Sequence, residues 1–176
     1  MMRLRKPPNV DPRRRPALSG SGAASLIIDG MSGVPSRLSV VTIGARDVSA
    51  LRRFYRALGW AEVPGSDDQW SAFLLGGVLL ALYPLHDLAA EAAPDVPDPA
   101  GGWSGVTLAC NVDSQEEVDM AFAAAVAAGA AVVGEPTDRP WGGRSAYVTD
   151  PEGNRWEIAW ARTAVFDQRG SLVSFG

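Results

Sequence analysis

The chain has 176 residues, enough for one domain with a substantial core or for two small modules that share one. Apolar residues make up 47% and charged residues 20%, which is ordinary for a soluble globular protein, and no apolar run approaches the roughly 20 residues of a membrane span. The single cysteine excludes an internal disulfide and a zinc site built on several thiolates, and the single histidine disfavours most transition-metal sites. We therefore expect a cytoplasmic protein without a membrane partner.

Charge is distributed unevenly along the chain. Residues 1–35 hold six of the 16 basic residues and only two of the 20 acidic residues, so the remainder is acidic. An acidic body argues against nucleic acid as the main partner and favours a cationic ligand. The Pro, Gly and Ser content of residues 1–35 indicates a disordered or non-native extension, with Met31 as an alternative start.

A regular pattern begins near residue 37. Residues 38–43 are apolar and β-branched, which predicts a strand. Asp47 can cap the next segment, a helix with an apolar stripe that ends at Gly59. The strands that we expect next lie over residues 60–63, 70–75 and 78–83.

The same order recurs after a linker, residues 85–103, in which a helical turn or two is expected. Ser114 to Glu117 form a capping box that opens a second helix, and Gly129 ends it. The strands expected around this helix lie over residues 106–109, 131–134, 145–149 and 155–160, the last two joined by the turn Asp-Pro-Glu-Gly-Asn.

The order strand, helix, strand, strand, strand thus occurs twice. One such unit leaves a sheet face uncovered, so two of them must pack together. We predict an α+β domain over residues 36–162, in which two tandem βαβββ modules, residues 36–84 and 104–162, form a pseudo-symmetric pair with a cleft between curved mixed sheets. Residues 163–176 are predicted to form a tail hairpin.

Two motifs stand out, Phe-Tyr-x-x-Leu-Gly at residues 54–59 and Asp-Pro-Glu-Gly-Asn-Arg-Trp-Glu at residues 150–157. With the segments around them, they resemble the vicinal oxygen chelate superfamily over residues 37–162. This superfamily includes glyoxalase I, extradiol dioxygenases and bleomycin-resistance proteins. The resemblance implies the paired-module fold and, because homodimers are common in the superfamily, a homodimer.

The resemblance also implies a metal site with one ligand from each of four strands. In this chain the corresponding positions are Val40, Ala81, Thr107 and Glu157. The side chains of Val40 and Ala81 have no lone pair, and Thr107 is a poor neutral ligand. The Glu157 carboxylate alone would therefore have to hold the ion in competition with water. His86 could complete a site only by swinging in from the linker. We therefore expect no metal and no cofactor.

Glu157 is the candidate functional residue of its strand. Side chains alternate along a strand, so Glu157 and Ala159 share one face, while Trp156, Ile158 and Trp160 share the other. The tryptophan face suits packing on the helices, which directs Glu157 toward the cleft. There it could accept a hydrogen bond from a ligand or act as a base. Alternatively, it is a relic held by a neighbouring Thr, Tyr or Arg144.

Several further side chains are candidates to bind a ligand beside Glu157. Aromatic clefts bind flat or amphipathic molecules by stacking and cation–π contact, whereas most aromatic residues simply fill cores. Polar residues at strand ends can contact a ligand or satisfy turn backbone instead. The candidates are Trp141, Tyr147, Thr107, Val40, Asn111 and Phe73.

Two classes of function follow. The first is a metal-free protein that sequesters a small organic molecule, cationic or aromatic, in an aromatic cleft. The second is a glyoxalase- or dioxygenase-like enzyme in which Glu157 serves an atypical metal site or acts as a metal-free base. The second class needs another titratable group beside Glu157, and the sequence identifies none.

Overall fold

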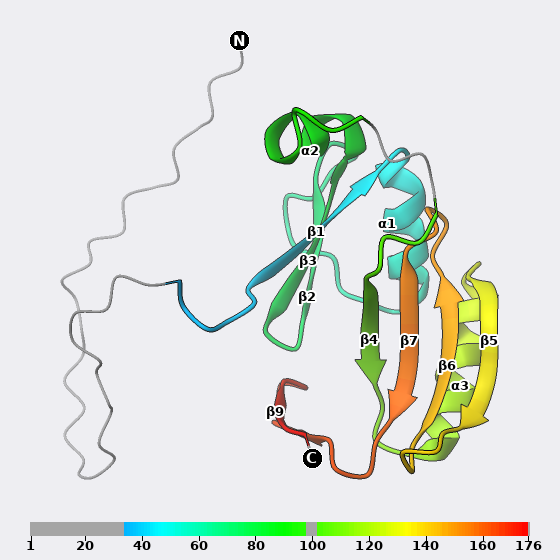
Figure 1. Ribbon diagram of the computed structural model, residues 1–176. Coiled ribbons are helices and arrows are strands. Elements are labelled where there is room, and N and C mark those ends of the chain that lie inside the picture. The colour runs from blue at the N-terminus through cyan, green and yellow to red at the C-terminus, as the bar shows by residue number, and fades with distance from the viewer. Residues whose placement is uncertain (1–33, 98–101, 176) are drawn as a thin grey trace, which may run out of the picture. The chain divides into compact units, whose positions relative to one another are not determined.

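The computed structural model describes residues 34–97 and 102–175 (Figure 1). Within them, a strand, a helix and two strands are followed by a strand, a helix and three strands, so the second module repeats the first with one more strand. Arg37–Gly176 forms a compact unit of its own. The extension is expected over residues 1–35, and residues 1–33 of it lie outside the described residues. The module boundaries stay predictions.

The elements confirm the α+β class. The first unit contains β1 (Val40–Ala45), α1 (Val48–Ala57), β2 (Ser71–Leu75) and β3 (Val78–Pro84), followed in the linker by α2 (Leu85–Ala92). The second contains β4 (Thr107–Asn111), α3 (Gln115–Ala127), β5 (Ala131–Asp138), β6 (Arg144–Thr149) and β7 (Arg155–Trp160). The tail carries β8 (Val165–Phe166) and β9 (Leu172–Ser174). None of the described helices is long and apolar enough to cross a membrane.

The strands of the two modules form two mixed sheets, and β8 pairs with β9 in a separate two-stranded sheet. In the first sheet, of order β1-β3-β2, β1 runs parallel to β3, which pairs antiparallel with β2. In the second, of order β4-β7-β6-β5, β4 runs parallel to β7, and the other pairs are antiparallel. Each module therefore places its first strand beside its last, which gives the two halves the same topology.

The strand expected over residues 60–63 is wrong in extent, because only an isolated bridge between Glu62 and Phe73 forms there. Val63 donates one backbone hydrogen bond to Ala72, at 2.9 Å, and Pro64-Gly65 then turns the chain away. Proline cannot donate to a sheet, so the pairing stops after one step.

The caps of the two long helices match the predicted signals. The Asp47 carboxylate accepts from the N–H of Ala50 at 2.8 Å, and the Ser114 hydroxyl accepts from the N–H of Glu117 at 3.2 Å. Gly59 and Gly129 follow the helix ends in left-handed conformations, with φ of 85° and 105°. Both helices pack on the same core, and α3 lies along one face of the second sheet (Figure 1).

An aromatic cluster fills the core between the modules. Tyr55 of α1 stacks on Trp60 with ring centres 5.1 Å apart, and it makes edge or tilted contacts with Phe73 and Trp156. Trp156 and Ile158 of β7 belong to the same core, which confirms the predicted inward face of this strand. The face that carries Glu157 therefore points away from the helices.

A buried hydrogen-bond chain joins the modules through this cluster. Tyr55 O–H donates to Asp150 Oδ2 at 2.6 Å, and Trp156 Nε1–H donates to the Tyr55 oxygen at 3.2 Å. Burial, together with the charge of Asp150, holds the pKa of Tyr55 far above its ordinary value, so the phenol stays a donor. Asp150 also accepts from Asn154 and from the N–H of Glu152, which closes the turn between β6 and β7.

That turn also contacts the start of α1. Glu152 Oε1 accepts from the N–H of Asp47 at 2.8 Å, and Arg46 lies 3.7 Å from the other carboxylate oxygen. An anion at a helix N-terminus satisfies a free N–H and complements the helix dipole. The Asp-Pro-Glu-Gly-Asn turn of one module thus stabilises the first helix of the other.

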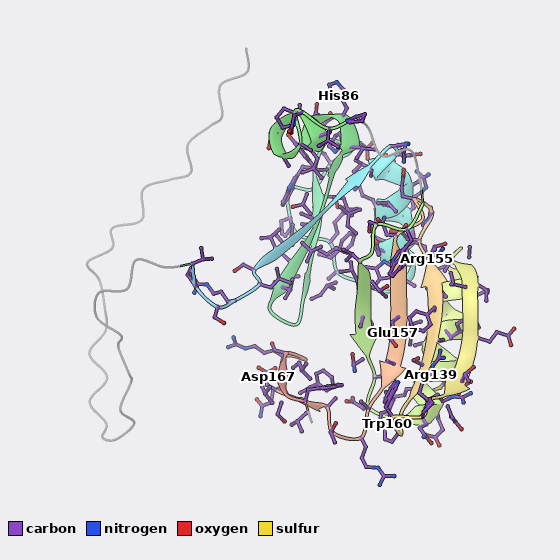
Figure 2. All side chains as sticks on the ribbon, viewed as in Figure 1. His86, Arg139, Arg155, Glu157, Trp160 and Asp167 are labelled. Atoms are coloured by element: carbon purple, nitrogen blue, oxygen red, sulfur yellow. The ribbon has the colours of Figure 1, made fainter. Side chains whose placement is uncertain are left out.

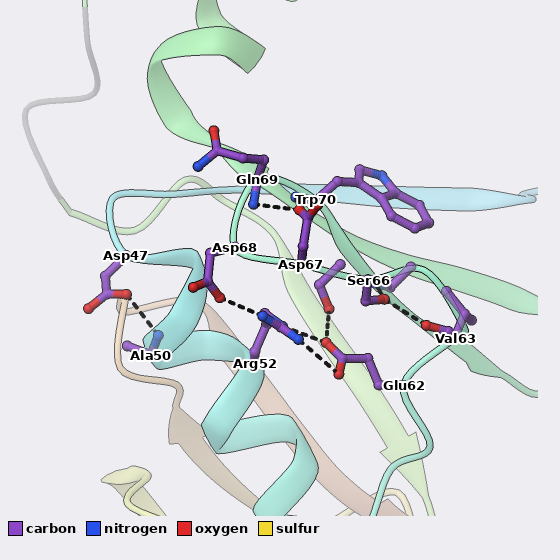
Figure 3. Close-up of polar contacts among 12 residues, drawn as sticks. Asp47, Ala50, Arg52, Glu62, Val63, Ser66, Asp67, Asp68, Gln69 and Trp70 are labelled. Atoms are coloured by element: carbon purple, nitrogen blue, oxygen red, sulfur yellow. Dashed lines mark hydrogen bonds and ion pairs between the residues drawn. The ribbon is translucent and has the colours of Figure 1, made fainter. Parts of the chain in front are cut away.

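A polar network anchors α1 within its own module (Figure 3). Arg52 donates from Nε to Glu62 at 2.6 Å and also pairs with Asp68. Ser71 donates to the same Glu62 oxygen, and the Arg52 hydrogen bond lowers the pKa of that carboxyl. Because Glu62 is held this way, it stabilises the fold and is not available to a ligand.

We expect Tyr55→Phe to lower the free energy of unfolding by about 1–3 kcal/mol, because it leaves the buried Trp156 N–H without its acceptor. Urea unfolding would measure the change. The matched control is Tyr147→Phe, whose hydroxyl lies on the exposed side of the second sheet, and which should cost less than about 1 kcal/mol. Equal losses in the two variants would contradict a joining role for Tyr55.

Candidate functional site

Glu157 lies midway along β7, on the face opposite the core (Figure 2). The register places it between Ala109 of β4 and Tyr147 of β6. Tyr147 O–H donates to Glu157 Oε1 at 2.7 Å. Of the partners considered from the sequence, it is thus Tyr147 that holds the carboxylate, whereas Arg144 pairs with Asp119 and Asp138.

Arg139 contacts the ring of Tyr147. The guanidinium carbon of Arg139 lies 5.4 Å from the centre of the Tyr147 ring, within cation–π range. Arg139 Nε donates to Ser145 Oγ at 2.8 Å, and this serine is fully buried. The hydrogen bond to Glu157 raises the pKa of Tyr147, so the phenol keeps its proton and remains a donor to the carboxylate.

A cavity of about 630 Å³ opens at Glu157. This volume is within the range of roughly 300–1,000 Å³ that small-molecule sites occupy. Strands β4 and β7, the loop before β6, and the tail all contribute to its walls. The lining residues are Ala109, Asn111, Trp141, Gly142, Glu157, Ala159, Ala161, Arg162, Thr163, Leu172 and Phe175.

The Trp-Gly-Gly stretch gives the cavity its aromatic rim. A Cβ on Gly143 would lie 1.6 Å from the Trp141 ring and 2.4 Å from the carbonyl oxygen of Trp160. Only glycine leaves room for the indole at this position. Trp141 itself is 56% exposed, so its ring is held over the loop with a face available to a ligand.

The charge of Glu157 has no cation paired with it within the described part of the chain. Its Oε2 likewise accepts no hydrogen bond from the residues that the structure describes. Arg162 is the other charged residue of the cavity, and it is exposed, so water screens it. The arrangement leaves one carboxylate oxygen able to accept a donor from a ligand.

The residues around Glu157 do not fit the metal site that the resemblance implies. Ala109 and Tyr147 flank it, and residues 34–97 and 102–175 contain no group of three His, Cys, Asp or Glu that could hold an ion. His86 lies on α2 with its side chain 91% exposed, away from Glu157 (Figure 2). A single carboxylate is a poor set of ligands for a transition metal.

The predicted site residues divide into two groups. Trp141, Asn111 and Glu157 line the same cavity, and Tyr147 contacts it through Glu157. The remaining three lie outside its lining: Thr107 pairs with Arg155 at the start of β4, Val40 is half-exposed on β1, and Phe73 is fully buried against Tyr55. Phe73 lies on the core face of β2, so no ligand in this cavity reaches it.

The sequence places Ala159 on the face of Glu157, but the contributions of Ala109 and of the tail to the cavity were not predicted. Ala109 shares the face of Asn111 by strand alternation, which is a signal that the sequence contains. Leu172 and Phe175 had no such signal, because nothing in the tail's own pattern indicates which part of the domain it contacts.

An apolar cavity of about 230 Å³ lies between α1 and α3. Cys110 is its one residue with reactive chemistry, and burial raises the pKa of that thiol to about 11. A thiol that stays protonated near neutral pH is a weak nucleophile. This cavity therefore offers packing space without chemistry.

Comparison with protein families places the sequence motifs in context. The model of the Glyoxalase/Bleomycin resistance protein/Dioxygenase superfamily matches residues 37–158. This range includes both motifs and ends one residue after Glu157, before the tail. A comparison with the curated proteins finds no match.

Solved structures share the fold over most of the chain. A glyoxalase-related enzyme from Fulvimarina pelagi is 29% identical, with a TM-score of 0.72, over 81% of this chain and 100% of its own. A lactoylglutathione lyase from Agrobacterium tumefaciens is 25% identical, with a TM-score of 0.58, over 76% and 100%. TioX from Micromonospora sp. ML1 is 25% identical, with a TM-score of 0.51, over 71% and 98%.

We expect Glu157→Gln to lower the pKa of Tyr147 toward its ordinary value, because the charged acceptor that favours the protonated phenol is removed. Ultraviolet titration of tyrosinate would follow this, with Tyr147→Phe identifying the component that belongs to this residue. The matched control is Glu135→Gln, an exposed carboxylate on β5. An unchanged titration in Glu157→Gln would show that the two side chains are not coupled.

Proposed function

This chain belongs to the Glyoxalase/Bleomycin resistance protein/Dioxygenase superfamily, and within it we propose that the protein binds a small organic cation without a metal. The ligand sits in the Glu157 cavity and is held by its carboxylate. The cavity is large enough for a compact organic molecule, at about 630 Å³.

The observation that carries this proposal is the unpaired carboxylate. Glu157 Oε1 is taken by Tyr147, while Oε2 has no partner among the described residues. A carboxylate oxygen without a partner can accept a charge-assisted hydrogen bond from a cationic donor of a ligand. The excess of acidic over basic residues after residue 35 would also attract a cation.

The aromatic rim narrows the class of ligand. Trp141 and Phe175 both line the cavity, and both are more than half exposed. Aromatic faces attract cations and stack on flat rings. An aromatic molecule that carries an amine or a quaternary nitrogen satisfies both the rings and the carboxylate.

An enzyme that uses Glu157 as a metal-free base is the second candidate. The observation in its favour is the Tyr147–Glu157 pair, since Tyr147 is the additional titratable group that such a mechanism needs. However, the raised pKa of Tyr147 makes it a poor proton donor to a substrate. The pair is better suited to holding a carboxylate in place than to moving a proton, so the binding function ranks first.

Ethidium, a flat aromatic cation with amino donors, is a suitable probe. We expect it to bind saturably, and Glu157→Gln to weaken its affinity about 10–100-fold, because a charge-assisted hydrogen bond contributes about 1.5–3 kcal/mol. Fluorescence titration would measure both dissociation constants. Glu135→Gln removes the same charge outside the cavity and should change the affinity less than about threefold.

Removal of metal provides a second arm of this experiment. Exhaustive treatment with EDTA should leave the ethidium affinity unchanged, because no metal takes part. Non-saturable binding, or equal affinity in the wild type and Glu157→Gln, would refute the proposal. Turnover of an isomerisation or ring-cleavage substrate that Glu157→Gln abolishes would establish the enzyme instead.

The proposal includes a cytoplasmic homodimer. An apolar row, Val40, Leu79 and Leu74, runs across the open face of the first sheet, and its two outer members are 48% and 66% exposed. A second copy could cover such a row. Sedimentation equilibrium should find a dimer that Leu74→Glu converts to a monomer, and a monomeric wild type would contradict this part.

A further inference from the structure

We propose that the C-terminal tail, residues 163–175, is a wall of the ligand site, so that the ligand carries an apolar body beside its cationic group. This inference rests on the proposed function and specifies the ligand further. It assigns Leu172 and Phe175 as specificity-determining residues.

The first support is the exposure of large apolar side chains at one cavity. Leu172, Phe175 and Trp141 line it together, and they are 54%, 64% and 56% exposed. Leu172 and Phe175 belong to the tail, and Trp141 to the loop before β6. Apolar surface that converges on a cavity from separate segments, with one carboxylate between them, matches an amphipathic molecule.

The second support is that the tail has a defined structure of its own. Strands β8 and β9 pair antiparallel around a turn that Asp167 closes. The Asp167 carboxylate accepts from the N–H groups of Arg169 and Ser171 at 2.8 and 2.9 Å. The N–H of Gly170 donates to the Asp167 carbonyl at 2.9 Å. A closed turn of this kind presents β9 in one orientation.

The third support is the close contact between this turn and the β2–β3 turn of the first module. A Cβ on Gly76, in the turn between β2 and β3, would lie 2.7 Å from the carbonyl oxygen of Gly170. A Cβ on Gly77 would lie 3.3 Å from Ser171 Oγ. Two turns that approach this closely position each other, although they belong to distant parts of the sequence. The tail is thus placed by its covalent link to β7 and by the β2–β3 turn.

The tail lies beyond residues 37–158, which the superfamily model matches. The apolar wall therefore lies outside the matched residues, and the ligand preference that it creates follows from Leu172 and Phe175 of this chain. An aromatic cation such as ethidium fits both parts of the site. A small cation without an apolar body meets Glu157 alone and should bind weakly.

The test measures ethidium affinity in the full chain with Leu172→Ser and Phe175→Ala combined. We expect a loss of about tenfold or more, because the dye would lose two apolar contacts. Val173→Ser is the matched control, since Val173 is an exposed residue of β9 outside the cavity lining. It should change the affinity less than about twofold.

A second pair of variants tests the contact between the tail and the β2–β3 turn without substituting a residue that lines the cavity. Gly76→Ala adds a Cβ against Gly170, so it should displace the turn and weaken ethidium binding severalfold while Leu172 and Phe175 remain. Gly65→Ala is the control, because Gly65 also has a positive φ, of 87°, but a Cβ there meets nothing within 4 Å. Gly76 has a φ of 51°, so both alanines would have a positive φ, and only the one at residue 76 meets a neighbouring segment.

The outcomes separate this inference from the proposed function. If the ethidium affinity falls in Glu157→Gln but not in the tail variants, the tail is not a wall of the site, while the proposed cation site at Glu157 stands. Wild-type protein that does not bind ethidium saturably would overturn both. Equal effects of Gly76→Ala and Gly65→Ala on ethidium affinity would refute the role of the β2–β3 turn in positioning the tail.

Discussion

The hydrogen bond from Tyr55 to Asp150 is the contact on which the rest of the domain depends. It joins the first helix of one module to a strand turn of the other, in a core where an unpaired polar group would be costly. Trp156 donates to the same phenol, so Tyr55 and Trp156 are both satisfied by a contact between the modules. The aromatic packing around them adds free energy without this directional specificity.

The burial of Trp156 beside this bond agrees with the outward direction of Glu157 that strand alternation predicts. Because Trp156 is drawn into the core, strand alternation places its neighbour on the opposite face. The register of β6 then brings Tyr147 beside the carboxylate at hydrogen-bond distance. The strand that places Trp156 in the core thus also carries, on the opposite side of the sheet, the residue that we propose binds a cation.

The motifs that identify the superfamily are mainly structural in this chain. Tyr55, Asp150 and Trp156 close the core, and Glu152 contacts the N–H of Asp47 at the start of α1. These roles need neither a metal nor a ligand, which explains how the motifs persist beside a site whose ligand set does not suit a metal. The fold is shared, and the proposed binding depends on Glu157, the last residue of the second motif, together with residues outside both motifs such as Tyr147 and Trp141.

The sequence by itself determined the helices, most of the strands and the outward face of Glu157, because caps, periodicity and alternation are local properties of neighbouring residues. Tertiary structure alone decided that Tyr147 holds Glu157, that Phe73 is buried, and that the tail lies at the cavity. Each of these depends on which distant segments pair and in what register, and no local pattern contains that information. The strand expected over residues 60–63 is reduced to a bridge for a local reason, because Pro64 cannot continue the pairing with β2.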